Sequence, residues 1–142
     1  MAFAQTQPTV QLIAETTFSS GDLYKFLMIS TANARVSIVE STAPNFVVGT
    51  LLSETFTTST GADEAVTVGL LSGIGKVYMA GSTLAAGAPV GCSTNGFGVL
   101  ASATTDTQQI GFIVSGTSGT TGRIHAVLFQ PPITPPSTAA GF

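Results

Sequence analysis

Short apolar segments recur roughly every ten residues along this chain, and that spacing limits its fold more than any other feature. Most of the segments are rich in Val, Ile, Phe and Thr and are bounded by Gly, Pro, Asn or Ser, which is typical of strands separated by turns. No window sustains the apolar period of a helix. The predicted strands are Val10–Ala14, Tyr24–Ser30, Arg35–Val39, Phe46–Leu52, Ala65–Leu71, Gly75–Met79, Val90–Ser93, Phe97–Ala101, Gln109–Ser115 and Arg123–Phe129.

This pattern predicts an all-β fold: a compact sandwich or small barrel of short antiparallel strands, with extended N- and C-terminal arms. The 142 residues, 44% of them apolar, are enough for one domain with a real core. The clearest hairpin signal is Asn95-Gly96 between two apolar runs. Both central residues of a type I′ turn need positive φ, which Asn and Gly tolerate.

Three regions are predicted along the chain. Residues 1–22 form an N-terminal arm and first strand, residues 23–130 a β domain, and residues 131–142 a proline-rich C-terminal tail. Pro131, Pro132, Pro135 and Pro136 disfavour regular ladders and favour extended chain, so we expect this tail to contact a partner.

The β domain also has two parts that look alike, residues 24–71 and 76–129. In each, a Gly-containing apolar strand leads through a Thr/Gly-rich loop into a second apolar strand, after a hairpin-like pair. An internal duplication explains this pattern, and so does chance similarity among Gly/Thr-rich strands. The two strands are Phe46–Ser53 and Ala65–Leu71 in the first part. They are Gln109–Ser115 and Ile124–Phe129 in the second part.

Charge is scarce. Only 8% of residues are charged, against about 25% in ordinary soluble domains, and the net charge is −3. A surface made of Thr, Ser, Gly and Ala is weakly protected against association, which suits a protein that works inside an assembly. The four basic residues are spread singly, so no nucleic-acid partner is expected. They are Lys25, Arg35, Lys76 and Arg123.

We expect no membrane partner, since the apolar runs are far shorter than the ~20 residues of a transmembrane helix. The first residues have neither a basic nor an apolar signal-peptide region, so no signal peptide is predicted. Cys92 is the single cysteine, which rules out a disulfide within one chain and fits a protein made in a reducing cytoplasm.

The residues that carry chemistry are few, and we predict no catalytic, cofactor-binding or metal-binding residues. His125 is the sole histidine and lies in an alternating apolar run, where a strand residue is the simpler interpretation than a general base. Cys92 has no activating charge nearby. Asp63 and Glu64 are the one adjacent acidic pair and are expected in a soluble loop. Gly73–Lys76 resembles part of a phosphate loop but lacks its first glycine and its hydroxyl residue.

Six segments between Asn45 and Phe129 occur in a recognisable order. They are Asn45–Leu52, Ala65–Gly73, Gly81–Val90, Gly96–Leu100, Gln109–Val114 and Ala126–Phe129. Together they resemble the capsid decoration (cement) proteins of tailed bacteriophages. The resemblance implies a non-enzymatic virion protein, made in the host cytoplasm, that binds the major capsid protein on the outer capsid surface as a homotrimer and stabilises the expanded shell. The alternatives are a tail or head-completion component, or a virion-surface carbohydrate-binding module.

Val10, Leu12 and Ile13 are apolar residues ahead of the main β block and need a partner. They are predicted to bind the capsid if this segment adds a strand to an exposed sheet edge of a capsid subunit. The other interpretation makes the segment the first strand of the chain's own sheet.

Overall fold

The computed structural model describes residues 7–30, 33–40, 47–55, 64–80, 85–101, 109–114 and 123–133. Within these ranges the chain is nearly all β, which confirms the predicted fold class. It has ten strands and two single-turn 3-10 helices, η1 and η2. In chain order the elements are β1 (Thr9–Ile13), η1 (Ser20–Asp22), β2 (Phe26–Ile29), β3 (Val36–Ile38), β4 (Val47–Leu51), β5 (Ala65–Leu70), β6 (Ile74–Met79), β7 (Pro89–Cys92), η2 (Thr94–Gly96), β8 (Gly98–Leu100), β9 (Gln109–Ile113) and β10 (Arg123–Ile133).

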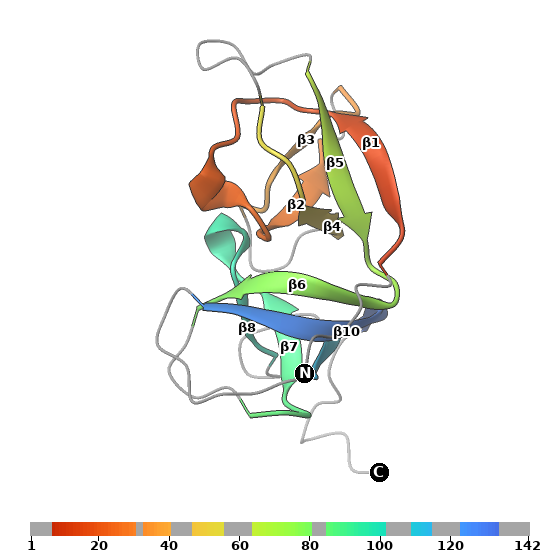
Figure 1. Ribbon diagram of the computed structural model, residues 1–142, viewed down its shortest axis with the longest axis vertical. Coiled ribbons are helices and arrows are strands. Elements are labelled where there is room, and N and C mark those ends of the chain that lie inside the picture. The colour runs from red at the N-terminus through yellow and green to blue at the C-terminus, as the bar shows by residue number, and fades with distance from the viewer. Residues whose placement is uncertain are drawn as a thin grey trace.

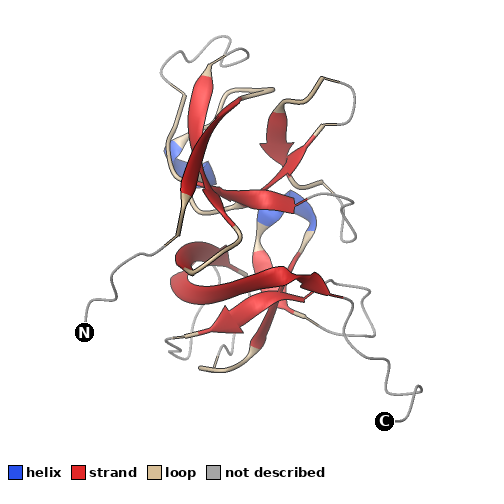
Figure 2. Ribbon diagram, turned by 90° about the vertical axis from the view of Figure 1, so that its right-hand side faces the viewer, coloured by secondary structure: helices blue, strands red, loops and turns tan. Residues whose placement is uncertain are grey.

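The strands form two stacked units (Figure 1). The first unit is a five-stranded sheet in the order β1-β5-β4-β2-β3, and the second is a closed barrel in the order β10-β6-β8-β7-β9. Figure 2 shows the same two layers from the side. All ten predicted strands are confirmed. The hairpin prediction is confirmed as well, since β7 and β8 pair antiparallel around Asn95 and Gly96, which have φ of 69° and 72°. The connection is the 3-10 turn η2, in which the Gly96 N–H donates to the Ser93 carbonyl, so it is not a two-residue type I′ turn.

Two details differ from the prediction. The pair β6–β8 is parallel, at Met79 and Gly98, whereas the other strand pairs within each unit are antiparallel. The last strand also continues to Ile133, through two prolines. Its pairing with β9 is irregular between Phe129 and Ile133, as expected where proline offers no N–H to the ladder. The strand therefore resumes beyond the prolines.

The two units have the same strand connectivity. Adding five to each number of β3-β2-β4-β5-β1 gives β8-β7-β9-β10-β6, the order found in the second unit. The registers agree too: Leu51 pairs with Val68 in the first unit, and Ile113 pairs with Val127 in the second. A register shift interrupts β2–β4, and another interrupts β7–β9 at the matching place. Most residues of one ladder thus have a structural counterpart in the other, whereas the pair of Ile133 with Gln109 belongs to the second unit alone.

The closing contact of the barrel also has a counterpart. In the second unit Met79 bridges Gly98, and the Ala80 N–H donates to the Gly98 carbonyl at 2.8 Å. In the first unit Ala14 makes a parallel bridge to Val36, and the Glu15 N–H donates to the Val36 carbonyl at 2.9 Å. The first sheet is therefore curved into nearly the same barrel.

The equivalence extends into the turn before β2 and β7. The Tyr24 N–H donates to the Leu51 carbonyl at 2.8 Å, and the Gly87 N–H donates to the Ile113 carbonyl at 2.7 Å. Both residues have positive φ, 66° at Tyr24 and 84° at Gly87. Strand order, register and turn geometry therefore recur in the two units, as internal duplication would produce, and the duplication itself stays a prediction.

Candidate interaction surface

The two units meet through a face of the first unit that points away from its own core. Along β2, Leu27 faces the core of the first unit, whereas Phe26 lies in the apolar cluster of the second. The Phe26 ring is fully buried and meets the Phe129 ring edge-on, with 6.5 Å between centroids. Gly96 of η2 lies so close that an added Cβ would be 2.7 Å from the Phe26 carbonyl oxygen. This junction is therefore closely packed.

Gln7 continues the junction across β4 and β5. Its side-chain amide donates to the Thr50 hydroxyl at 3.1 Å and to the Leu70 carbonyl at 3.0 Å. A Cβ added at Gly69 or at Gly75 would collide with the Gln7 side chain. Because Gly69 belongs to β5 and Gly75 to β6, Gln7 fills the space between the two units.

Charged and aromatic side chains form the rim of the junction. The Tyr78 N–H donates to the Tyr24 carbonyl at 2.9 Å, which links β6 to the turn before β2. The Lys76 ammonium lies 5.6 Å from the Tyr24 ring centroid, and the Lys25 ammonium lies 5.0 Å from that of Phe97. Cation–π contacts of this kind add modest attraction between the units.

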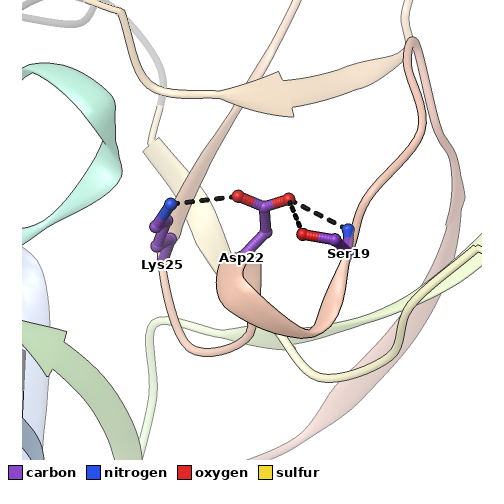
Figure 3. A network of polar contacts seen from close by, with 3 residues as sticks. All are labelled: Ser19, Asp22 and Lys25. Carbon is purple, nitrogen blue, oxygen red and sulfur yellow. Dashed lines mark hydrogen bonds and ion pairs between the residues drawn. The ribbon is translucent and has the colours of Figure 1, made fainter.

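Asp22 holds Lys25 in place (Figure 3). One carboxylate oxygen lies 3.0 Å from the Lys25 ammonium, and the other accepts from the Ser19 N–H and hydroxyl at 2.9 and 3.0 Å. Burial by itself raises the pKa of Asp22, but the hydrogen bonds from Ser19 and Lys25 together lower it below the ordinary value of 3.8. The carboxylate is therefore charged at neutral pH, and its role is to orient the rim.

A second face, on the outside of the barrel, is apolar and exposed. Pro89, Phe112, Leu128 and Ile74 pair directly across β7, β9, β10 and β6, so they form one row on the outer surface. Phe112 is 38% exposed and Leu128 46%. We call these four residues the second-unit row. Contiguous apolar surface of this kind marks an interaction site more often than scattered residues do.

The predicted arm is a strand of the first unit. Thr9–Ile13 forms β1, which pairs with β5, so the second of the two interpretations describes its place in the fold. Val10 and Leu12 are half-buried against the core of the first unit, and Ile13 is 41% exposed. Capsid contact by these three residues stays a prediction.

The structure describes part of the proline-rich tail. Pro131 and Pro132 lie in β10, and Pro135 and Pro136 lie outside the described residues. Partner contact by the four prolines stays a prediction.

The two reactive side chains are buried. Cys92 is 2% exposed, its thiol donates to the Ser93 carbonyl at 3.4 Å, and burial raises its pKa to about 12. The thiol is thus protonated at neutral pH. His125 is 4% exposed and pairs with Val77 in the β6–β10 ladder. Asp63 falls outside the described residues, whereas Glu64 is half-buried beside β5. Within the described ranges, no three His, Cys, Asp or Glu side chains cluster as metal ligands.

A hollow on the first unit is lined by Glu15, Thr16, Met28, Ser30, Ser37, Ile38 and Glu40. Carbohydrate sites stack sugars on aromatic rings, and none of these lining residues is aromatic. The hollow therefore gives no support to the carbohydrate-binding alternative. None of the helical segments that the structure describes has the length and apolarity to span a bilayer.

Sequence reasoning missed the junction and the second-unit row. A signal for both was present in the proposed repeat, where Thr50 and Gly69 of the first part match Phe112 and Leu128 of the second. A change from small to large apolar residues at outward positions indicates that the two surfaces have different surroundings.

No protein-family model and no curated protein sequence matches the chain. Its structure is similar to the N base of the head fiber protein gp8.5 of bacteriophage phi29, with a TM-score of 0.53 and 17% sequence identity. The match covers 88% of this chain and 95% of that chain. The two proteins share a fold across nearly their whole lengths.

Proposed function

We propose that this chain is a structural protein of a phage virion, which binds the outside of an icosahedral capsid as a decoration protein and stabilises the expanded shell. The observation that carries the proposal is the fold shared with the N base of a phage head fiber, over 88% of this chain. The decoration-protein resemblance of the sequence points to the same kind of particle. The expected partners are the major capsid protein and further copies of this chain in a homotrimer.

The surface of the chain supports an adhesive role. Strands β9 and β10 expose apolar side chains, and only 8% of the residues of the chain are charged. The buried Cys92 and His125 fit a protein whose function is binding. Several contacts made at once by an oligomer raise the effective concentration of each, so weak individual contacts suffice. A protein that binds only the assembled shell stabilises it by mass action.

A second candidate is the base of a fiber that projects from the head. It is favoured by the name of the similar structure, a head fiber base. The two candidates differ in what the protein does for the shell: a decoration protein raises shell stability, whereas a fiber base serves as an attachment point.

The test uses expanded and unexpanded shells of the parent phage that lack this protein. Purified chain should co-sediment with expanded shells and raise their melting temperature. Binding without any rise in melting temperature selects the fiber-base candidate. Absence of binding to either shell, with binding to a glycan array instead, overturns the proposal.

A further inference from the structure

We infer that the second-unit row (Pro89, Phe112, Leu128 and Ile74) is the docking site for the first unit of a second copy of this chain, in a contact that repeats the junction between the two units. The inference specifies the self-association that the proposed function includes. It is tested in solution without capsids, so it stands or fails separately from capsid binding.

The second-unit row has an equivalent row in the first unit. In the first unit, Phe26 pairs with Thr50, and Thr50 pairs with Gly69. In the second unit, Pro89 pairs with Phe112, and Phe112 pairs with Leu128 at the equivalent positions. In the first unit this row is buried: Phe26 and Thr50 are both 0% exposed, because the second unit and Gln7 cover them. The second-unit row therefore corresponds to a surface that the chain already covers with its own fold.

The residues that cover the first-unit row also have counterparts in the first unit. Phe129 and Tyr78 of the second unit contact Phe26 and Tyr24. By ladder position, the counterpart of Phe129 in the first unit is Leu70. Both pair with a glycine of the preceding strand, and the N–H of each donates to a carbonyl just before β1 or β6, at Pro8 for Leu70 and at Gly73 for Phe129.

The counterpart of Tyr78 is Ile13, since each precedes the residue that makes the parallel bridge. Ile13 is 41% exposed. Along Thr9–Ile13, β1 pairs with β5 alone among the described residues. The N–H of Ala14 faces β5, where it donates to Glu64, so the N–H of Ile13 faces the opposite edge. The first unit thus offers an apolar side chain and a strand edge at the matching place.

The repeated contact can be written atom by atom. In the junction the Tyr78 N–H donates to the Tyr24 carbonyl, and Gly87 is the counterpart of Tyr24. Between copies, the Ile13 N–H of one chain donates to the Gly87 carbonyl of the next. The Leu70 side chain of the first chain then packs on Pro89 of the second, as Phe129 packs on Phe26 in the junction. Phe112 and Leu128 continue the same row beneath the first chain.

The difference in residue size fits this assignment. Thr50 and Gly69 suffice inside one chain, because the linker holds the units together and Gln7 fills the space between them. Association of separate chains loses translational and rotational freedom, so it needs larger apolar groups, which Phe112 and Leu128 supply. A head-to-tail contact either closes into a ring or continues as a filament. The expected homotrimer is the closed ring.

Light scattering on three variants tests the inference. Leu128→Ser and Ile13→Asp alter opposite sides of the contact. Ile124→Ser is the matched control: Ile124 is 48% exposed on the same strand, but its counterpart Ala65 is exposed in the first unit, so this position lies outside the contact. Wild type and Ile124→Ser should have three times the 14.3 kDa chain mass, and the other two variants should be monomers with unchanged circular dichroism.

A disulfide pair gives an independent readout. Ile13→Cys together with Gly87→Cys should form interchain crosslinks up to the trimer under mild oxidation, whereas Ile13→Cys with Ile124→Cys should not. A wild-type monomer at tens of micromolar, or a trimer that persists in both Leu128→Ser and Ile13→Asp, overturns the inference. A monomeric wild type whose shell binding is lost in Leu128→Ser and kept in Ile124→Ser assigns the row to the capsid instead, and also overturns it.

Discussion

Gly49 and Gly111 lie at equivalent positions in β4 and β9, and each leaves room for a main-chain carbonyl of the neighbouring strand. A Cβ at Gly49 would collide with the Gly69 carbonyl oxygen, and one at Gly111 with the Leu128 carbonyl oxygen. Gly69 and Leu128 are themselves counterparts. The same backbone approach is thus built twice, and it is among the few places where the two units keep the same residue.

Alanine at either glycine should destabilise the protein, because the obstacle is backbone and cannot turn aside as a flexible side chain can. We expect Gly49→Ala and Gly111→Ala to lower the free energy of unfolding by about 1–3 kcal/mol, as overpacking usually does. Chemical denaturation measures this. Gly21→Ala is the control, since its Cβ would meet nothing nearer than the Ser19 hydroxyl at 3.7 Å. Equal stability of all three variants would show that the strands shift freely.

The buried thiol should make the protein less stable at high pH. Burial raises the pKa of Cys92 from the ordinary value of 9.0 to about 12, so the folded state keeps its proton while the unfolded state loses it. The stability contributed by this group is complete below pH 9.0 and falls between pH 9.0 and about 12, by up to about 1.4 kcal/mol per pH unit. Urea denaturation of wild type and Cys92→Ala across this range should show a flatter profile for the variant. Parallel profiles would contradict the prediction.

Asp22 should give a pH dependence of the opposite sign. Its pKa is lowered in the folded state, so its contribution is present above the ordinary value of 3.8 and is lost as pH falls through the folded pKa. Asp22→Asn should cost about 1 kcal/mol at pH 7, in the range of a lost capping interaction. Its thermal stability should also change less than that of wild type between pH 5 and pH 2, measured by circular dichroism. An unchanged slope in the variant would assign the acid sensitivity to other carboxylates.

Phe26→Ala should weaken both units at once. The ring belongs to a first-unit strand but lies in the second-unit cluster, so its loss leaves a cavity at the junction. We expect a loss of about 3–5 kcal/mol, typical of a buried Phe→Ala change. In wild type the calorimetric and van't Hoff enthalpies should agree, because the junction couples the units into one transition. Two separate transitions in wild type would show that the junction contributes little.

Much of the fold was predictable from the sequence, because its signals are local. Most of the ten strands have apolar runs that end at or near Gly, Pro, Asn or Ser, and the Asn95-Gly96 pair specifies its own turn through positive φ. The continuation of β10 past Pro131 was not predictable, because it depends on Ile133 finding Gln109 on another strand. Long-range pairing of this kind leaves no local pattern.

The interaction surface was harder to predict. Periodicity marks alternate residues of a strand as buried or exposed, but Phe26 and Leu27 are consecutive and both fully buried. They point to opposite faces, and a second unit covers the outer one. In β10 the outward Leu128 remains exposed. Which of the two faces is covered depends on how the units stack, and that information is spread over both halves of the chain.

The contact between Phe26 and Phe129 also sets an order of events at the ribosome. The strands of the first unit can pair as soon as β5 has been synthesised, but the ring that covers Phe26 arrives with β10, the last strand that the structure describes. Until then the first unit of the nascent chain is nearly complete but exposes the apolar face that contains Phe26. Fast translation through the second unit, or a chaperone bound to that side, would shorten the period in which neighbouring chains on a polysome could exchange halves.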